Sequence, residues 1–150
     1  MTEWRHRVAE AGRLALDTNA LIYYLDRTMP YYPLCAAVFG LAEDGRIEIV
    51  VPTLAEVELL VGLLRKGDHA GIARLRLFLE RFPGLEVAPL DRAAALAAAR
   101  LRAELGLATP DALLAGTALS AGCSAVVGND RLCSERLTEP AYLCLSDYVG

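Results

Sequence analysis

Short apolar runs that alternate with longer segments of helical periodicity constrain the fold of this chain more than any other feature. Each run has the usual length of a buried strand, and most are followed by a segment in which apolar residues recur every three or four positions. This alternation is typical of β-α units around a parallel sheet. The expected strands are Leu14–Asp17, Ile47–Val51, Leu85–Ala88, Ser124–Gly128 and Ala141–Leu145.

The segments between these strands are predicted to be helical. Asp91 is a suitable N-cap, Gly106 a suitable helix end, and Thr109 a suitable N-cap before Pro110. A length of 150 residues fits one domain, which we assign to residues 14–150, with residues 1–13 as an N-terminal leader. The expected helices are Ala20–Leu25, Pro33–Ala42, Thr53–Arg65, Asp68–Phe82, Asp91–Leu105, Thr109–Ala121 and Asp130–Arg136.

The composition excludes a disordered chain and a generally basic nucleic-acid-binding protein. Hydrophobic residues make up 55% of the sequence and the mean hydropathy is +0.33, so we expect apolar surface to remain for a partner or a second copy. The net charge is −4, and all 15 basic residues except Lys66 are arginines. Binding to nucleic acid would therefore need a local arginine patch or a bound cation.

Cysteine and histidine patterns do not indicate a zinc site. The four cysteines form no C-x-x-C pair and the two histidines match no zinc motif. Three of the four cysteines lie in or beside apolar segments, so we interpret these as buried thiols in a reducing compartment. No apolar stretch approaches the length of a membrane span, and residues 1–13 lack the apolar core of a signal peptide. We therefore expect a cytoplasmic protein without membrane contact.

Four acidic residues occupy equivalent positions in the predicted β-α units: Asp17, Glu56, Asp111 and Asp130. The carboxyl ends of parallel strands share one edge of the sheet, so these residues can meet in one crevice. Carboxylates held close together repel one another, which is unfavourable for the fold. A divalent cation such as Mg²⁺, which binds carboxylate oxygens, removes this repulsion. This arrangement favours a metal site suited to phosphate chemistry.

Each acidic residue also has a purely structural interpretation. Glu56 completes a predicted capping box that starts at Thr53, and the other three can cap a helix or favour its first turn. Glu58 lies about 200° from Glu56 around the helix, so we expect it to point elsewhere. Taken one at a time, these residues are more often caps than metal ligands.

The order of motifs resembles the PIN domain family, in particular the VapC-type toxins of toxin–antitoxin pairs. The resemblance rests on LALDTNALIYYLD, VPTLAEVELLVG and ATPDALLAGTALSAGCSAVVGNDR, and it covers Leu14 to Leu145. It implies a three-layer α/β/α sandwich with a central parallel sheet, and a ribonuclease that depends on Mg²⁺ or Mn²⁺. By position it assigns catalysis and metal binding to Asp17, Glu56, Asp111 and Asp130, with support from Thr18, Asn19 and Asn129. Apart from the resemblance, Arg131 and Arg136 flank Asp130 and are candidates for phosphate contacts, although a solvated helix face suits at least one of them better.

The resemblance also implies a homodimer and an antitoxin whose helix occupies an apolar groove, for which Pro33–Ala42 and Thr53–Arg65 are candidates. The chain departs from the family in two places. Gly128 stands where a Thr or Ser is common, and Leu132-Cys133 stands where an aromatic residue is common. The first change removes a hydroxyl that could orient a carboxylate.

Two other functions fit parts of the sequence. An Asp-dependent phosphotransferase would use Asp17 as a phosphate acceptor, although one such class needs an acid where the chain has Asn19 and another needs a late lysine. A non-catalytic PIN-like module that binds RNA or protein would not require a metal ion. Binding of Mn²⁺ would distinguish the nuclease from the inert module.

Overall fold

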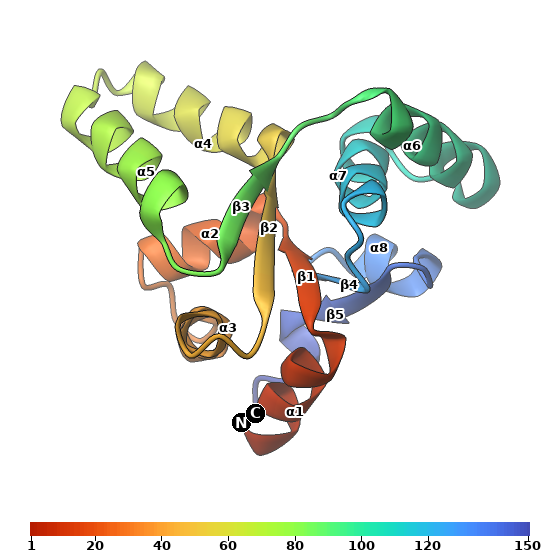
Figure 1. The fold of residues 1–150 in the computed structure, drawn as a ribbon, viewed down its shortest axis with the longest axis horizontal. Coiled ribbons are helices and arrows are strands. Elements are labelled where there is room, and N and C mark those ends of the chain that lie inside the picture. Colours follow the sequence, from red (N-terminus) through yellow and green to blue (C-terminus); the bar gives the residue numbers. More distant parts are fainter.

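Five parallel strands form the centre of the protein, in the order β3-β2-β1-β4-β5 (Figure 1). The computed structural model describes all 150 residues. In the central strand, Leu14 is paired with Ile49 on one side and with Ala125 on the other. The predicted α/β fold with a parallel sheet is confirmed. The strands are β1 (Arg13–Leu16), β2 (Glu48–Pro52), β3 (Leu85–Ala88), β4 (Ala125–Gly128) and β5 (Ala141–Cys144).

The helices α2 to α8 agree with the predicted positions to within a few residues at each end, whereas α1 lies in residues 1–13, where no helix was predicted. Asp91 caps α6 as predicted, whereas α7 starts at Thr109 after Ala108 rather than using Thr109 as its N-cap. None of the helices is both long and apolar enough to cross a membrane. They are α1 (Thr2–Ala11), α2 (Thr18–Leu25), α3 (Tyr32–Glu43), α4 (Thr53–Arg65), α5 (His69–Arg81), α6 (Arg92–Leu105), α7 (Thr109–Ser120) and α8 (Arg131–Arg136), with a short 3₁₀ turn at Leu145–Asp147.

The sheet lies between two helical layers, which confirms the predicted three-layer sandwich. Side chains alternate along each strand, so that Leu14 and Leu16 face one layer and Ala15 the other. The larger core, with 23 buried residues, joins the first face to α1, α2, α3 and α5. On the opposite face α7 packs against the sheet and α6 packs against α7 (Figure 1).

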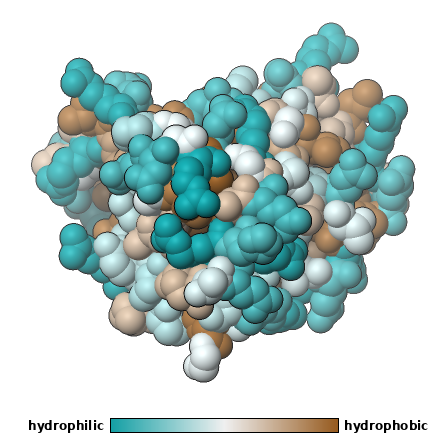
Figure 2. Space-filling model, turned by 60° about the horizontal axis from the view of Figure 1, so that its bottom comes forward, coloured by the Kyte–Doolittle hydropathy of each residue, from teal (hydrophilic) through white to brown (hydrophobic).

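Residues 1–13, interpreted from the sequence as a leader, contribute a helix to the main core. Trp4 and Val8 of α1 are fully buried there, one turn apart on the same side of the helix. The Trp4 indole nitrogen donates a hydrogen bond to the Leu34 carbonyl at 2.8 Å, and its ring lies 4.8 Å from the ring of Tyr148. The other side of α1 is polar, and Figure 2 shows a mainly hydrophilic surface in this part of the molecule.

All four cysteines are free and buried, whereas the sequence predicted burial for three of them. Cys35 belongs to the main core, while Cys123 and Cys133 belong to the two smaller clusters around α7. Burial raises the pKa of the Cys35 thiol to about 12 and that of the Cys123 thiol to about 11. These two cysteines therefore stay protonated at neutral pH and act as small apolar side chains.

Candidate metal centre

An acidic pocket of about 130 Å³ lies at the carboxyl ends of β1 and β4. The chain connects β1 outward to β2 and β3 on one side, whereas β4 and β5 lie on the other side. Connections that leave in opposite directions open a crevice between adjacent strand ends, the usual place for a ligand in an open α/β sheet. The acidic residues that line the pocket are Asp17, Glu58, Asp111 and Asp130.

Asp17 is the most constrained of these residues because both of its carboxylate oxygens accept hydrogen bonds. It caps α2 by accepting from the Ala20 backbone N–H at 2.8 Å. Its other oxygen accepts from the Asn129 backbone N–H at 3.3 Å and from the Tyr142 hydroxyl at 3.1 Å. Burial nevertheless raises its pKa to about 6, and the nearby charge of Asp130 adds to the increase.

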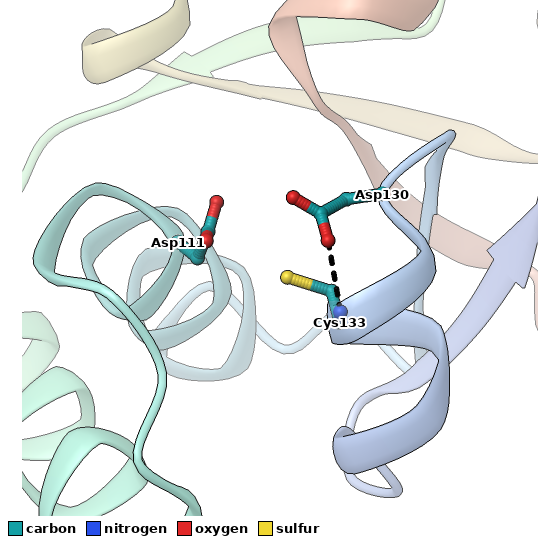
Figure 3. Close-up of side chains that lie close together, drawn as sticks. All are labelled: Asp111, Asp130 and Cys133. Atoms are coloured by element: carbon teal, nitrogen blue, oxygen red, sulfur yellow. Dashed lines mark hydrogen bonds between the residues drawn. The ribbon is translucent and has the colours of Figure 1, made fainter.

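Asp111 and Asp130 face each other across the pocket, from α7 and from the loop before α8 (Figure 3). One possible metal-ligand atom from each of Asp111, Asp130 and Cys133, a carboxylate oxygen or the Sγ, lies within 4.8 Å of the other two. Asp130 also caps α8 by accepting from the Cys133 backbone N–H at 3.0 Å. The pKa of the Asp111 carboxyl is raised, first by burial and then by the charge of Asp130. Two of the predicted carboxylates therefore form one side of a shared site, with a buried thiol beside them.

The structure places Glu58 rather than Glu56 in the pocket. Glu58 lines it, and the charge of Glu58 contributes to the raised pKa of Asp111. Glu56 lies in the first turn of α4 and is absent from the pocket wall. The predicted capping box is also not formed, because Pro52 is the N-cap of α4 and no side chain caps it. The expectation that Glu58 points elsewhere is thus wrong, whereas its separation from Glu56 around the helix is as expected.

The three predicted supporting residues take different positions. Thr18 and Asn19 line the pocket, and the buried Thr18 hydroxyl oxygen has no hydrogen-bond partner. The Asn129 side chain is directed to other groups: its carbonyl oxygen accepts from the Ser146 backbone N–H at 3.0 Å and hydroxyl at 2.6 Å. Asn129 therefore acts through its backbone N–H on Asp17 and ties the end of β4 to the C-terminal segment.

Arg131 and Arg136 are bound to other parts of the chain and do not line the pocket. The Arg131 guanidinium forms an exposed ion pair with Asp147 at 2.9 Å. Arg136 donates to the Gly106 carbonyl at 3.0 Å, at the C-terminal end of α6. Positive side chains are favourable near helix C-termini, so this contact gives Arg136 a structural role.

Tyr142 of β5 is a residue of the pocket that the sequence analysis did not identify. Its hydroxyl bonds to Asp17, and it also accepts from the Asp130 backbone N–H at 2.9 Å. The only signal in the sequence was Gly128, whose missing side chain leaves room for this contact.

A larger groove of about 580 Å³ adjoins the pocket between α2, α4 and α5. Its apolar wall is formed by Ile22, Leu25, Leu59, Leu63, Leu75 and Phe78. Glu58 lines both the groove and the acidic pocket, which makes the two cavities neighbours. Of the two segments predicted to form such a groove, α4 contributes to it and α3 does not.

Three solved structures with the same fold are toxin–antitoxin complexes or carry the VapBC name. VapBC2 from Rickettsia felis bound to a promoter DNA fragment has a TM-score of 0.69 at 20% identity, with 88% of this chain and 98% of that chain covered. DNA-bound VapBC from Salmonella typhimurium has a TM-score of 0.65 at 24% identity, with 89% and 98% covered. A toxin–antitoxin complex from Klebsiella pneumoniae has a TM-score of 0.66 at 18% identity, with 88% and 97% covered.

The sequence itself gives a family assignment. No curated protein sequence matches the chain. The family model described as the PIN domain matches residues 14–135, which is most of the chain and includes every acidic residue of the pocket. The chain therefore belongs to the PIN domain family.

Proposed function

We propose that the protein is a divalent-metal-dependent ribonuclease of the VapC toxin type, which hydrolyses RNA phosphodiester bonds. The observation that carries the proposal is the meeting of Asp17, Glu58, Asp111 and Asp130, from four separate segments, in one pocket. Membership of the PIN domain family and the shared fold with VapBC structures support it. Helix capping alone explains two of these residues, Asp17 and Asp130, but gives no reason for all four to converge.

The donor set of the pocket fits a hard cation such as Mg²⁺ or Mn²⁺. Carboxylate oxygens are the preferred protein ligands of these ions. The raised pKa values of Asp17 and Asp111 show that the pocket disfavours additional negative charge, which a divalent cation would offset. The unpartnered Thr18 hydroxyl adds a further oxygen. Asp17, Asp111 and Asp130 would hold the ion. Burial and the neighbouring carboxylates raise the pKa of the Cys133 thiol to about 12, so it stays protonated and is a poor ligand.

When bound, the cation would attract the scissile phosphate and lower the pKa of an attacking water. Asp17 keeps its orientation through its hydrogen bonds to Ala20, Asn129 and Tyr142. Glu58 is the exposed carboxylate at the rim, and its side-chain oxygens would accept the proton of the water. The role that the sequence analysis gave to Glu56 is in this proposal carried by Glu58.

Substitution of Glu58 and Glu56 tests the proposal and the choice between the two glutamates. In Glu58→Gln, we expect Mg²⁺-dependent cleavage of a fluorescent RNA to fall by about a hundredfold or more, because the variant loses a group that accepts a proton. In Glu56→Gln, the rate should stay within about twofold of the wild type, because this residue does not line the pocket. Cleavage rates are measured with Mg²⁺, with Mn²⁺ and with a chelator.

Glu58→Gln and Glu56→Gln each remove one negative charge from neighbouring turns of α4. The two variants therefore differ mainly in whether the substituted glutamate lines the pocket. Loss of activity in Glu56→Gln with full activity in Glu58→Gln would restore the assignment made from the sequence. An RNA cleavage rate that is unchanged by the chelator would instead contradict metal dependence as a whole.

We further propose that the groove between α2, α4 and α5 binds a helix of an antitoxin. VapBC and toxin–antitoxin complexes share the fold, and the groove offers the apolar wall that an amphipathic helix needs. Glu58 connects the groove to the acidic pocket, so a basic side chain at the end of such a helix would reach the carboxylates. The homodimer implied by the family resemblance stays a prediction, and the exposed side chains Val57, Val61 and Leu64 of α4 are candidates for it.

An exposed leucine of the groove allows the antitoxin contact to be separated from catalysis. Leu25 is 39% exposed, and in Leu25→Glu we expect RNA cleavage to persist while inhibition by an antitoxin that inhibits the wild type weakens by about tenfold or more. Leu96→Glu is the control, because Leu96 is also exposed but lies on α6, away from the groove. Inhibition is followed as residual RNA cleavage at increasing inhibitor concentration. Equal inhibition of both variants would place the contact elsewhere.

A further inference from the structure

The hydroxyl of Tyr142 connects two acidic segments that are far apart in sequence. It donates to a carboxylate oxygen of Asp17 at 3.1 Å and accepts from the backbone N–H of Asp130 at 2.9 Å. A hydroxyl has one donor and two acceptor positions, so both bonds can form at the same time. Tyr142 comes from the edge strand β5, whereas Asp17 follows the central strand β1. The contact thus fixes the Asp17 carboxylate relative to the loop that carries Asp130.

The space for this contact exists because position 128 has no side chain. A Cβ atom on Gly128 would lie 2.1 Å from the Asp17 carboxylate oxygen and 2.1 Å from the Tyr142 hydroxyl oxygen. Separations this short cannot be tolerated, so a larger residue would displace one or both groups. Gly128 is also paired with Cys144 of β5, so the backbone cannot easily move away. The chain therefore combines a glycine at the end of β4 with a hydroxyl supplied by β5.

We propose that Tyr142 is a positioning residue of the metal site, which holds Asp17 and the Asp130 loop in the arrangement that binds the cation. The inference deepens the proposed function and rests on it, because it concerns the same carboxylates. In this proposal the Tyr142 hydroxyl orients the Asp17 carboxylate. A side chain at position 128 cannot do so here, because the Tyr142 and Asp17 side chains occupy that space.

The physical basis is the number of partners that a ligand carboxylate needs to keep one orientation. Groups that hydrogen-bond to metal ligands fix their direction, and their removal typically weakens metal binding by about tenfold to a hundredfold. One Asp17 oxygen would keep only the 3.3 Å bond to Asn129 if the hydroxyl were removed. The Asp130 backbone N–H would lose its acceptor as well. Both effects loosen the same pair of carboxylates.

The test compares Mn²⁺ binding by the full chain in the wild type, Tyr142→Phe and Tyr32→Phe. Phenylalanine keeps the ring and removes only the hydroxyl, and we expect Tyr142→Phe to bind Mn²⁺ about tenfold or more weakly by calorimetry. Tyr32→Phe is the control, because the Tyr32 ring stacks on Tyr24 and does not line the acidic pocket. A melting curve without metal accompanies each titration, since a merely structural role would lower the melting temperature without changing the Mn²⁺ affinity of the folded protein.

Gly128→Ser provides a second variant with an independent expectation. Its side chain should displace Asp17 and Tyr142 and weaken Mn²⁺ binding, and combining it with Tyr142→Phe should cause less loss than the two single losses multiplied, because one clash is relieved.

Equal Mn²⁺ affinity of Tyr142→Phe and the wild type, or fully multiplicative losses in the double variant, would overturn the positioning role while leaving the nuclease proposal intact. Absence of Mn²⁺ binding by the wild type would overturn the proposed function itself.

Discussion

Asp17→Asn is expected to abolish metal-dependent RNA cleavage, with a fall of about a thousandfold or more, while leaving the metal-free protein folded. The variant removes a negative charge from the pocket and keeps a side chain of the same shape. Mn²⁺ should raise the melting temperature of the wild type and leave that of the variant unchanged, because only a folded state that binds the ion gains stability from it. Cleavage assays and melting curves with and without Mn²⁺ measure both effects.

The same substitution should remove part of the pH dependence of stability. The pKa of Asp17 is raised from 3.8 to about 6 in the folded protein, so its neutral form stabilises the fold. This contribution is fully present below the unfolded pKa of 3.8 and is lost as the pH rises through about 6. The loss corresponds to about 3 kcal/mol, since each unit of pKa is worth about 1.4 kcal/mol.

Urea unfolding at a series of pH values from about 4 to about 7 measures this contribution. Without metal, the free energy of unfolding should fall more steeply with rising pH in the wild type than in Asp17→Asn. Asp17→Asn avoids the cost of burying a charge at neutral pH, but it also loses hydrogen bonds. The amide has one acceptor oxygen, whereas the carboxylate accepts three hydrogen bonds, so the net gain in the free energy of unfolding is smaller. Asp44→Asn, in an exposed turn, is the control. Full cleavage activity in Asp17→Asn would rule out the proposed metal site.

The sequence was sufficient to place three of the four carboxylates in one pocket. Asp17 and Asp130 follow the adjacent parallel strands β1 and β4. Asp111 lies in the first turn of α7, which packs on the face of the sheet that these two strands help to form. These positions follow from the order of β-α units, because parallel strands bring their carboxyl ends to one edge regardless of their spacing in the chain. No precise side-chain geometry was needed for this inference.

The choice between Glu56 and Glu58 could not be made in the same way. Two residues separated by 200° on a helix cannot face one pocket together, but the pattern alone does not fix which of them does. The position after the second strand and the family resemblance favoured Glu56. In the structure Pro52 ends the extended segment, and α4 is rotated so that Ala55 is buried and Glu58 lines the pocket. The rotation of a helix about its axis depends on tertiary packing, which periodicity describes only coarsely.

Tyr142 was not predictable for a different reason. Its contact with Asp17 joins residues 125 positions apart and depends on the β4-β5 register and on the empty space at Gly128. The sequence did show that a hydroxyl was missing at position 128, but not which segment supplies one. Tyr142 can be placed near the pocket only when the strand order is known, because that order puts β5 at the edge of the sheet next to β4.

Trp4→Ala is expected to cost about 3–5 kcal/mol of stability, the usual range for removing a fully buried tryptophan. For a domain of this size the melting temperature should fall by roughly 10 °C. The loss combines the cavity in the main core with the hydrogen bond to the Leu34 carbonyl and the contact with the Tyr148 ring. Thermal melting followed by circular dichroism measures the effect.

Arg5→Ala is the matched control, because Arg5 is on the same helix and is exposed. Removal of residues 1–12 should destabilise the protein at least as much as Trp4→Ala, since the truncation removes Val8 as well and uncovers the core beneath α1. A truncated chain that melts at the wild-type temperature would instead show that residues 1–13 are a dispensable leader. The acidic pocket lies at the opposite ends of the strands, so a folded Trp4→Ala protein should still bind Mn²⁺ with wild-type affinity, which separates the support of the fold by α1 from the chemistry of the site.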